Sequence, residues 1–323
     1  MKIVSLLPSA TEIVCALGLG DALVGVTHEC DYPPFVSDLP KVTRTRIPAD
    51  VSSGEIDRMV REQRQSGHAL YTLDLATLER LEPDLILTQA LCGVCAVAEE
   101  EVQAAACRLP GRPRVINLEP RRFADVLASI RLVAEAAGVD SRAGELIARL
   151  ESRVDAVRDR TRRVRSRRRV AFLEWLEPPF CSGHWTPELV EWAGGVDVLG
   201  RAGQPSRMVG WDEVLAGEPE LVFIACCGFG VERTLQDVMR LKEVPEWRRL
   251  AIVGAGRVYV TDGSQYFSRP GPRLVDSLEI LAHALDPDLH PLPEGMNSLV
   301  EVKWFPSGAR ASRLPDFVTV RVE

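Results

Sequence analysis

The sequence predicts an α/β protein of two Rossmann-like lobes, each with a parallel sheet, joined by a long connector helix. Short apolar strands alternate with helical segments in both halves, the second half repeats the order of elements of the first, and a polar helical stretch separates them. Alternation of this kind is typical of parallel sheets that are covered on both faces. The length of 323 residues also exceeds what one core normally fills, ~250–300 residues.

The first half begins with a strand and a helix. The stretch Ser9–Glu12 places a hydroxyl at a helix start and a carboxylate three residues later, which predicts a capping box. Gly18–Asp21 then ends this helix. An extra segment, Val36–Tyr71, carries a second capping box at Ser52–Glu55. The expected strands of this half are Lys2–Leu7, Leu23–Val26 and Leu85–Thr88.

The second half repeats these steps. Thr186 and Pro187 predict a helix start, because a hydroxyl residue caps a helix and proline fits its first position. Gly194–Asp197 then ends that helix, as Gly18–Asp21 does in the first half. The expected strands of this half are Val170–Leu173, Leu221–Ile224 and Arg257–Val260.

A polar stretch from Phe123 to Arg165 lies between the halves, and its apolar side chains recur at helical spacing. Only Gly138–Asp140 interrupts it, so we expect one or two helices here. The resulting ranges are an N-terminal lobe at 1–120, a connector helix at 121–167, a C-terminal lobe at 168–290 and a tail at 291–323. Two strand-like segments predict a β-hairpin in this tail, packed on a lobe or a partner chain: Leu299–Trp304 and Phe317–Val322.

Composition and charge exclude several function classes. The net charge of -7 argues against nucleic acid as the main partner, and the arginine-rich end of the connector is expected to be a solvated helix face. No apolar run reaches the ~20 residues that span a bilayer, so we do not expect a membrane-embedded protein. The chain opens on a core strand without a secretory signal, which predicts a cytoplasmic location as the chain stands; a periplasmic or extracellular location would require that a signal had been removed.

The loops that follow the strands are the expected place for a ligand. Open parallel sheets bind ligands beyond the carboxyl ends of their strands, so two facing sheets would enclose an interlobe cleft. The loops that meet this description are Pro8–Ser9, Thr27–Pro34, Gln89–Cys95, Glu174–His184, Cys226–Gly230 and Thr261–Pro270.

Motifs in and around these loops resemble those of class III substrate-binding proteins, which deliver cobalamin, haem or ferric siderophores to ABC importers. The matching segments are Ile3–Glu12, Leu17–Val26, Asp31–Pro34, Pro178–Phe180 with Ser182 and Gly183, and Phe267–Arg269 with Gly271–Arg273. The resemblance is closest to the cobalamin-binding branch and covers Lys2 to Leu285. It implies the class III substrate-binding-protein fold, with residues 2–290 forming one Fe/cobalamin periplasmic-binding-like domain and with modest hinge motion.

The resemblance also implies site residues and a partner. Tyr32 matches the position whose ring touches the corrin in that branch, and the loop from Gln265 matches one that meets the ligand. A corrin is a broad disc rimmed by amides, which aromatic faces and hydrogen-bond donors would hold. In the family, an acidic residue on each lobe docks onto an ABC permease; Asp212 or Glu213 fits this role, whereas Ala76 falls at the first-lobe position. The expected ligand-binding residues are Ser9, Tyr32, Gln89, Gln265, Tyr266, Phe267 and Arg269.

Six of the eight cysteines fall in the strand-end loops, together with two histidines. Without structural disulfides, which a reducing compartment disfavours, their candidate roles are packing, metal binding or redox chemistry. A Cys-x-x-Cys at a helix start is able to hold Zn²⁺ or an Fe–S cluster, or to cycle with a disulfide. A thiolate or imidazole would also be able to coordinate the metal of a bound corrinoid. The candidate metal ligands are Cys92, Cys95, His28, Cys30, Cys181, His184, Cys226 and Cys227.

These observations leave three function classes. The leading one is a non-catalytic binder of a small molecule, cobalamin or a related corrinoid or metal chelate, which works with an ABC permease. The alternative is a cytoplasmic protein that binds Zn or an Fe–S cluster through its loop Cys and His residues. The third is a thiol redox enzyme built on Cys92 and Cys95. No Ser-His-Asp order, P-loop or paired-carboxylate motif stands out, so we do not expect an enzyme.

Overall fold

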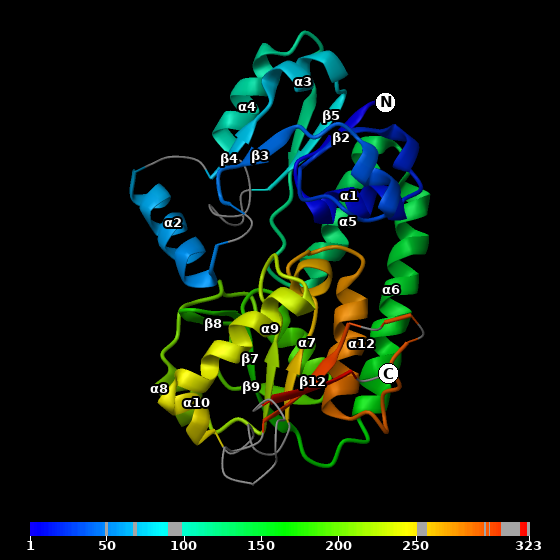
Figure 1. The fold of residues 1–323 in the computed structure, drawn as a ribbon. Helices are drawn as coiled ribbons and strands as arrows, with labels where there is room; N and C mark the ends of the chain where they lie inside the picture. Colours follow the sequence, from blue (N-terminus) through cyan, green and yellow to red (C-terminus); the bar gives the residue numbers. More distant parts are fainter. Residues whose placement is uncertain are drawn as a thin grey trace. The chain divides into compact units, whose positions relative to one another are not determined.

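The computed structural model describes residues 1–48, 51–66, 70–89, 99–250, 257–293, 295–296, 298–304 and 317–321. The chain divides into two compact units (Figure 1). The N-terminal unit is Met1–Leu150 with Pro270–Pro272, and the C-terminal unit is Glu151–Arg269 with Arg273–Glu323. The division falls inside helix α6 (Asp140–Thr161), so this helix contributes to both units.

The N-terminal unit is built on a four-stranded parallel sheet in the order β2-β1-β5-β6. All residues of β1 and β5 are buried, which explains why both strands read as unbroken apolar or small residues rather than as an alternating pattern. The sheet ends where Pro8 begins a helix, so the strand expected to reach Leu7 stops at Ser5. Its strands are β1 (Ile3–Ser5), β2 (Leu23–Val26), β5 (Leu85–Thr88) and β6 (Arg114–Asn117).

In the extra segment of this unit, β3 (Thr43–Thr45) pairs with β4 (Tyr71–Leu73) as a two-stranded antiparallel ladder. Helix α2 (Ser53–Ser66) lies between these strands in the sequence. The capping box predicted at its start is confirmed. Ser52 N donates to Glu55 Oε2 over 2.9 Å, and Glu55 N donates to Ser52 Oγ over 3.3 Å.

The capping box predicted at Ser9–Glu12 is wrong. Helix α1 (Pro8–Ala16) begins one residue earlier, at a proline, and no side chain caps it. Ser9 and Glu12 therefore lie inside the helix, where both are buried. The other helices of the unit are η1 (Gly20–Ala22), η2 (Pro34–Asp38), α3 (Leu75–Leu81), α4 (Glu99–Arg108) and α5 (Phe123–Ala137).

Helices α5 and α6 form the stretch that the sequence predicts to be helical. Gly138 separates them in the left-handed conformation, with φ of 69°, which glycine adopts without steric cost. The apolar side chains of α6 are buried along one face: Ala143, Leu146, Ile147, Leu150, Val154 and Val157.

The C-terminal unit carries a sheet in the order β13-β12-β11-β10-β7-β8, with β9 paired to β7. The strands β9, β7, β10 and β11 are mutually parallel, whereas β8, β12 and β13 join in antiparallel fashion. This arrangement confirms the predicted α/β class. The strands are β7 (Arg168–Leu176), β8 (Pro179–Cys181), β9 (Gly195–Asp197), β10 (Leu221–Ile224), β11 (Val258–Val260), β12 (Val300–Trp304) and β13 (Phe317–Arg321).

Short helices cover this sheet. Helix α7 (Thr186–Trp192) starts with proline in its first turn as predicted, but Trp185 rather than Thr186 is the N-cap residue. Helix α12 lies against α7 (Figure 1). The remaining helices are α8 (Trp211–Ala216), α9 (Val231–Arg240), η3 (Leu241–Glu243), α10 (Pro245–Arg249), η4 (Gly263–Phe267) and α12 (Leu274–Leu285). Within the described ranges, no helix has both the length and the apolar character needed to cross a bilayer.

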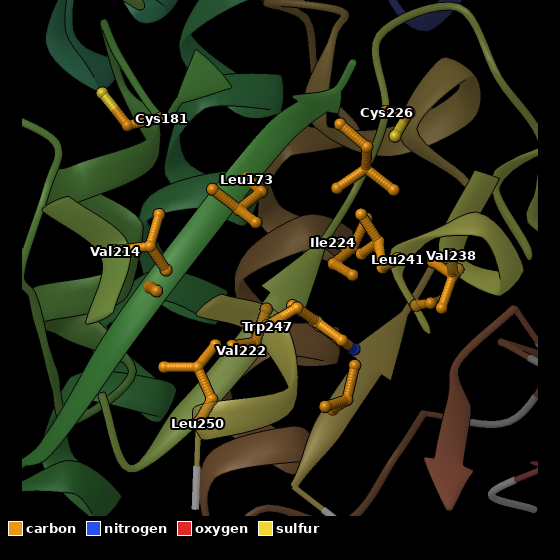
Figure 2. Packing of buried hydrophobic residues seen from close by; sticks show 14 of the residues in the cluster. Leu173, Cys181, Val214, Val222, Ile224, Cys226, Val238, Leu241, Trp247 and Leu250 are labelled. Atoms are coloured by element: carbon orange, nitrogen blue, oxygen red, sulfur yellow. The ribbon is translucent and has the colours of Figure 1, made fainter. Parts of the chain in front are cut away.

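The core on one face of this sheet is shown in Figure 2. Trp247 of α10 is fully buried and meets Trp211 edge to face, with 5.6 Å between ring centroids. Side chains from β7 and β10, such as Leu173 and Val222, pack into the same cluster. Two cysteines, Cys181 and Cys226, belong to it as well.

Candidate functional site

A hydrogen-bonded network lies at the carboxyl end of β2. The hydroxyl of Thr43, on β3, is 2.7 Å from Thr27 Oγ1 and 2.8 Å from His28 Nδ1, and it accepts from His28 N over 3.1 Å. The His28 ring also lies against the Tyr71 ring, with centroids 5.3 Å apart, and Tyr71 donates to Glu29 Oε1 over 2.9 Å. The loop after β2 is thereby fixed to the β3–β4 ladder.

Burial lowers the pKa of His28 below its usual value. The carboxylate of Glu29 opposes this shift, and the ammonium of Lys41 adds to it. The imidazole is therefore neutral at pH 7. A neutral ring offers one nitrogen as a donor and the other as an acceptor.

Tyr32 follows in the same loop and is 43% exposed, a large exposed fraction for an aromatic residue. Phe35, in η2, is 48% exposed and is a second exposed aromatic residue of this unit. The loop between them is held by Lys41, whose Nζ donates to the carbonyls of Cys30 and Val36 over 3.2 and 3.0 Å. Tyr32 is thus presented to solvent from a fixed loop.

The other predicted ligand residues of this unit are less accessible. Ser9 is buried within α1. Gln89 is also buried, directly after β5, and its Oε1 has no hydrogen-bond partner in the part of the chain that the structure describes. Cys92 and Cys95, which follow Gln89, lie outside the described residues.

In the C-terminal unit, the predicted loop after β11 forms the π-helical turn η4. Asp262 caps it, because its carboxylate accepts from Gln265 N over 2.7 Å and from Gln265 Nε2 over 3.0 Å. Gln265 is exposed, and Tyr266 is half-buried. Phe267, in contrast, is only 3% exposed, with its ring 5.0 Å from that of Phe172.

Arg269 ends this loop and is also buried, at 5% exposed. Its Nη2 donates to Ser264 Oγ over 3.4 Å, across the turn η4. Of the four residues predicted in this loop, Gln265 and Tyr266 are therefore the ones with surface to offer a ligand.

The C-terminal unit contains two carboxylates, Glu174 and Asp197, whose burial the sequence does not predict. Glu174, on β7, accepts from Gly183 N over 3.2 Å and from Ser206 Oγ. Asp197, at the end of β9, accepts from the backbone of Leu199 and Gly200. Burial raises the pKa of Asp197 as well, although these hydrogen bonds oppose the shift.

Burial raises the pKa of Glu174 to about 7, and the nearby carboxylate of Asp197 adds to the shift against the hydrogen bonds from Ser206 and Gly183. The signal that would have pointed to Glu174 is its place directly after the apolar run Val170–Leu173. A carboxylate there must leave water if the chain folds over the strand end.

Those of the predicted metal ligands that the structure describes are not brought together as a metal site. Nowhere in the described ranges do three His, Cys, Asp or Glu side chains lie close enough to hold one metal ion. Figure 2 shows Cys181 and Cys226 well apart in the hydrophobic cluster, and burial raises the pKa of both thiols. Cys30 is buried with its Sγ 3.0 Å from Thr11 Oγ1, whereas Cys227 is exposed.

The His184 side chain lies beside its neighbour in sequence, Trp185. Its ring stacks on that of Trp185 at 5.5 Å, and its backbone N donates to Gln204 O over 2.6 Å. Its φ of 51° is the left-handed conformation, which costs free energy for a residue other than glycine. The surrounding turn therefore holds His184 in a strained backbone geometry.

Comparison with known proteins gives consistent matches over most of the chain. A family model described as periplasmic binding protein matches residues 3–264. The uncharacterized ABC transporter substrate-binding lipoprotein YvrC of Bacillus subtilis is 25% identical over 301 residues, which cover 89% of this chain and 80% of that protein.

Solved structures agree with the fold. The periplasmic vitamin B12 binding protein BtuF of Vibrio cholerae superposes with a TM-score of 0.65 at 20% identity, over 88% of this chain and 96% of that chain. A periplasmic heme binding protein from Pseudomonas aeruginosa gives a TM-score of 0.68 at 18% identity, over 92% and 96%. At these identities the likeness shows the fold, and it confirms the predicted architecture.

Proposed function

The chain belongs to the periplasmic binding protein family, and on that premise we propose that it is a substrate-binding protein for cobalamin or a related metal chelate. It binds this ligand without changing it chemically. The observation that carries the proposal is the exposed ring of Tyr32 in a fixed loop after β2, on the edge where an open parallel sheet binds its ligand. A flat, partly apolar chelate would cover such a ring. Relatives of the fold that bind vitamin B12 or heme support this ligand class.

The alternative, a Zn or Fe–S protein, has no support from the described residues. Cys30, Cys181 and Cys226 are buried, and no three His, Cys, Asp or Glu side chains in the described ranges form a group that could hold a metal ion. The thiol redox hypothesis depends on Cys92 and Cys95, which lie outside the described ranges.

We also propose that an ABC permease is the partner and that Asp212 of α8 is its docking residue on the C-terminal unit. Asp212 is exposed in the first turn of α8. Its neighbour Glu213 is already paired with Arg207, whose Nη1 donates to Glu213 Oε2 over 3.1 Å. The cytoplasmic location stays a prediction, which cell fractionation would test together with the partner.

Titration of the purified protein with cyanocobalamin and, separately, with hemin tests the function. We expect a shifted visible spectrum and saturable binding for at least one of them. Tyr32→Ala should weaken that binding about tenfold or more, because a large ring contact with the chelate is lost. Phe35→Ala is the matched control, since it removes a similarly exposed aromatic ring from the neighbouring turn η2. Equal affinities for wild type and Tyr32→Ala would contradict the role of Tyr32; no binding of either chelate would contradict the function.

A further inference from the structure

The network at His28 determines which ring nitrogen carries the proton. Two buried hydroxyl protons, those of Thr27 and Thr43, must each find an acceptor. Within the described structure, the acceptors in reach are the other hydroxyl oxygen and His28 Nδ1, which is 2.8 Å from Thr43 Oγ1 and 3.4 Å from Thr27 Oγ1.

Both possible directions of this chain of hydrogen bonds place the ring proton of His28 on the same nitrogen. The two hydroxyls cannot donate to each other at the same time, because both protons would then lie between the same two oxygens. One of them must therefore donate to His28 Nδ1, whichever way the chain of hydrogen bonds runs. Nδ1 is the acceptor, and the proton of the neutral imidazole is on Nε2.

This assignment changes the role that the sequence suggested for His28. A metal ion bound at Nε2 would require that nitrogen to lose its proton. If the proton moved to Nδ1 instead, one buried hydroxyl would lose its acceptor, which is unfavourable. The network thus makes His28 a hydrogen-bond donor rather than a metal ligand. Among the residues described, nothing accepts from Nε2.

The charges around the ring indicate which acceptor suits it. Glu29 and Asp31 follow His28 in the loop, and the ammonium of Lys41 is engaged by two backbone carbonyls. An anionic group near Nε2 would therefore face the carboxylate of Glu29, whose electrostatic effect on the ring exceeds that of the Lys41 ammonium. Protonation of His28 would supply a cation only by placing a proton on Nδ1, which the hydroxyl network opposes.

We propose that His28 donates its Nε2 proton to an uncharged amide oxygen on the rim of the ligand, so that this loop favours amide-bearing chelates over carboxylate-bearing ones. The inference rests on the proposed function and names the ligand chemistry within it. The buried Gln89 amide, at the end of β5, would suit the same rim, because an amide group both donates and accepts.

Two corrins with one ring and one metal test this selectivity. Dicyanocobinamide carries amide side chains, whereas the heptacarboxylic acid of the same dicyano-corrin carries carboxylates. We expect the wild type to bind the amide corrin about tenfold or more tightly. His28→Leu should lose about tenfold for the amide corrin and little for the acid, while His28→Gln, which keeps a donor at similar reach, should retain most of the affinity.

The tautomer is measurable without any ligand. Long-range ¹H–¹⁵N NMR spectra of the wild type at pH 8 should show the His28 proton on Nε2, and Thr43→Val should weaken that preference by removing the bridging hydroxyl. A proton on Nδ1 in the wild type would overturn the inference, as would equal affinity of the two corrins or unchanged binding by His28→Leu. If the NMR spectra place the His28 proton on Nε2 but neither corrin nor hemin binds, the proposed function is wrong, and the amide ligand proposed for His28 is wrong with it. The assignment of the His28 tautomer would still stand.

Discussion

Replacement of Glu174 by glutamine should stabilise the fold at high pH and much less at low pH. In the folded chain this carboxylate has a pKa of about 7 instead of 4.5 because it is buried. Glutamine has nearly the same shape, and its oxygen is able to accept from Gly183 N as the carboxylate does. The variant therefore removes the charge while it preserves the hydrogen bond from Gly183.

The sign follows from proton linkage. Because the folded-state pKa is raised, the folded state holds the proton more tightly than the unfolded chain between pH 4.5 and 7. The stabilisation that Glu174 contributes to the folded wild type is therefore fully present below pH 4.5 and is lost as the pH rises through 7. The full shift of the Glu174 pKa corresponds to about 3 kcal/mol, and the remaining solvent contact of the side chain reduces the expected difference to roughly 1–2 kcal/mol.

Urea unfolding of wild type and Glu174→Gln at pH 4, 5, 6, 7 and 8 measures this difference. The stability of the variant relative to wild type should rise across the series and level off above pH 7. Glu151→Gln, which changes an exposed carboxylate on α6, is the control and should give a flat difference. A flat difference for Glu174→Gln, or one that falls with pH, would contradict the raised pKa of Glu174.

Three further predictions concern packing, charge and thiol reactivity. Gly183→Ala should cost about 1–3 kcal/mol or more in urea unfolding, because the added Cβ would lie 2.2 Å from the backbone N of Ser206; an unchanged midpoint would refute this. Arg153→Met should lower stability by about 1–2 kcal/mol in low salt and less in high salt, because the partly exposed guanidinium pairs with two carboxylates of α12 at 2.6 Å. Iodoacetamide at pH 8 should label the exposed Cys227 but not Cys226, whose pKa is raised far above its usual value by burial. Peptide mass spectrometry identifies the labelled residue, and labelling of Cys226 in the folded protein would contradict this.

The sequence predicts the central strands well and the helix starts less well. Leu85–Thr88 and Leu221–Ile224 are strands over the expected residues, because fully buried parallel strands leave unbroken apolar runs between turn signals. Ser9–Glu12 has the spacing of a capping box as clearly as Ser52–Glu55 does. The difference is Pro8, which begins α1 one residue before Ser9. The local pattern does not say which residue of a polar stretch becomes the first helical one.

The sequence likewise predicts only part of the candidate site. The position of Tyr32 after a strand is readable from the sequence, and its exposure agrees with a ligand role. The sequence does not predict a role for Tyr71, because this residue reaches His28 from a separate ladder, β3–β4, which only the folded chain places beside β2. The strand-end cysteines mislead for a related reason. A strand end fixes where Cys226 lies along the sheet, but tertiary packing turns its side chain into the core.

A visible-spectrum titration of the wild-type protein with cyanocobalamin, with hemin in parallel, shows whether the protein binds a metal chelate at all. The proposed function predicts saturable binding of a metal chelate, with a shifted spectrum, that Tyr32→Ala weakens and Phe35→Ala does not. Failure of the intact protein to bind either chelate would contradict it.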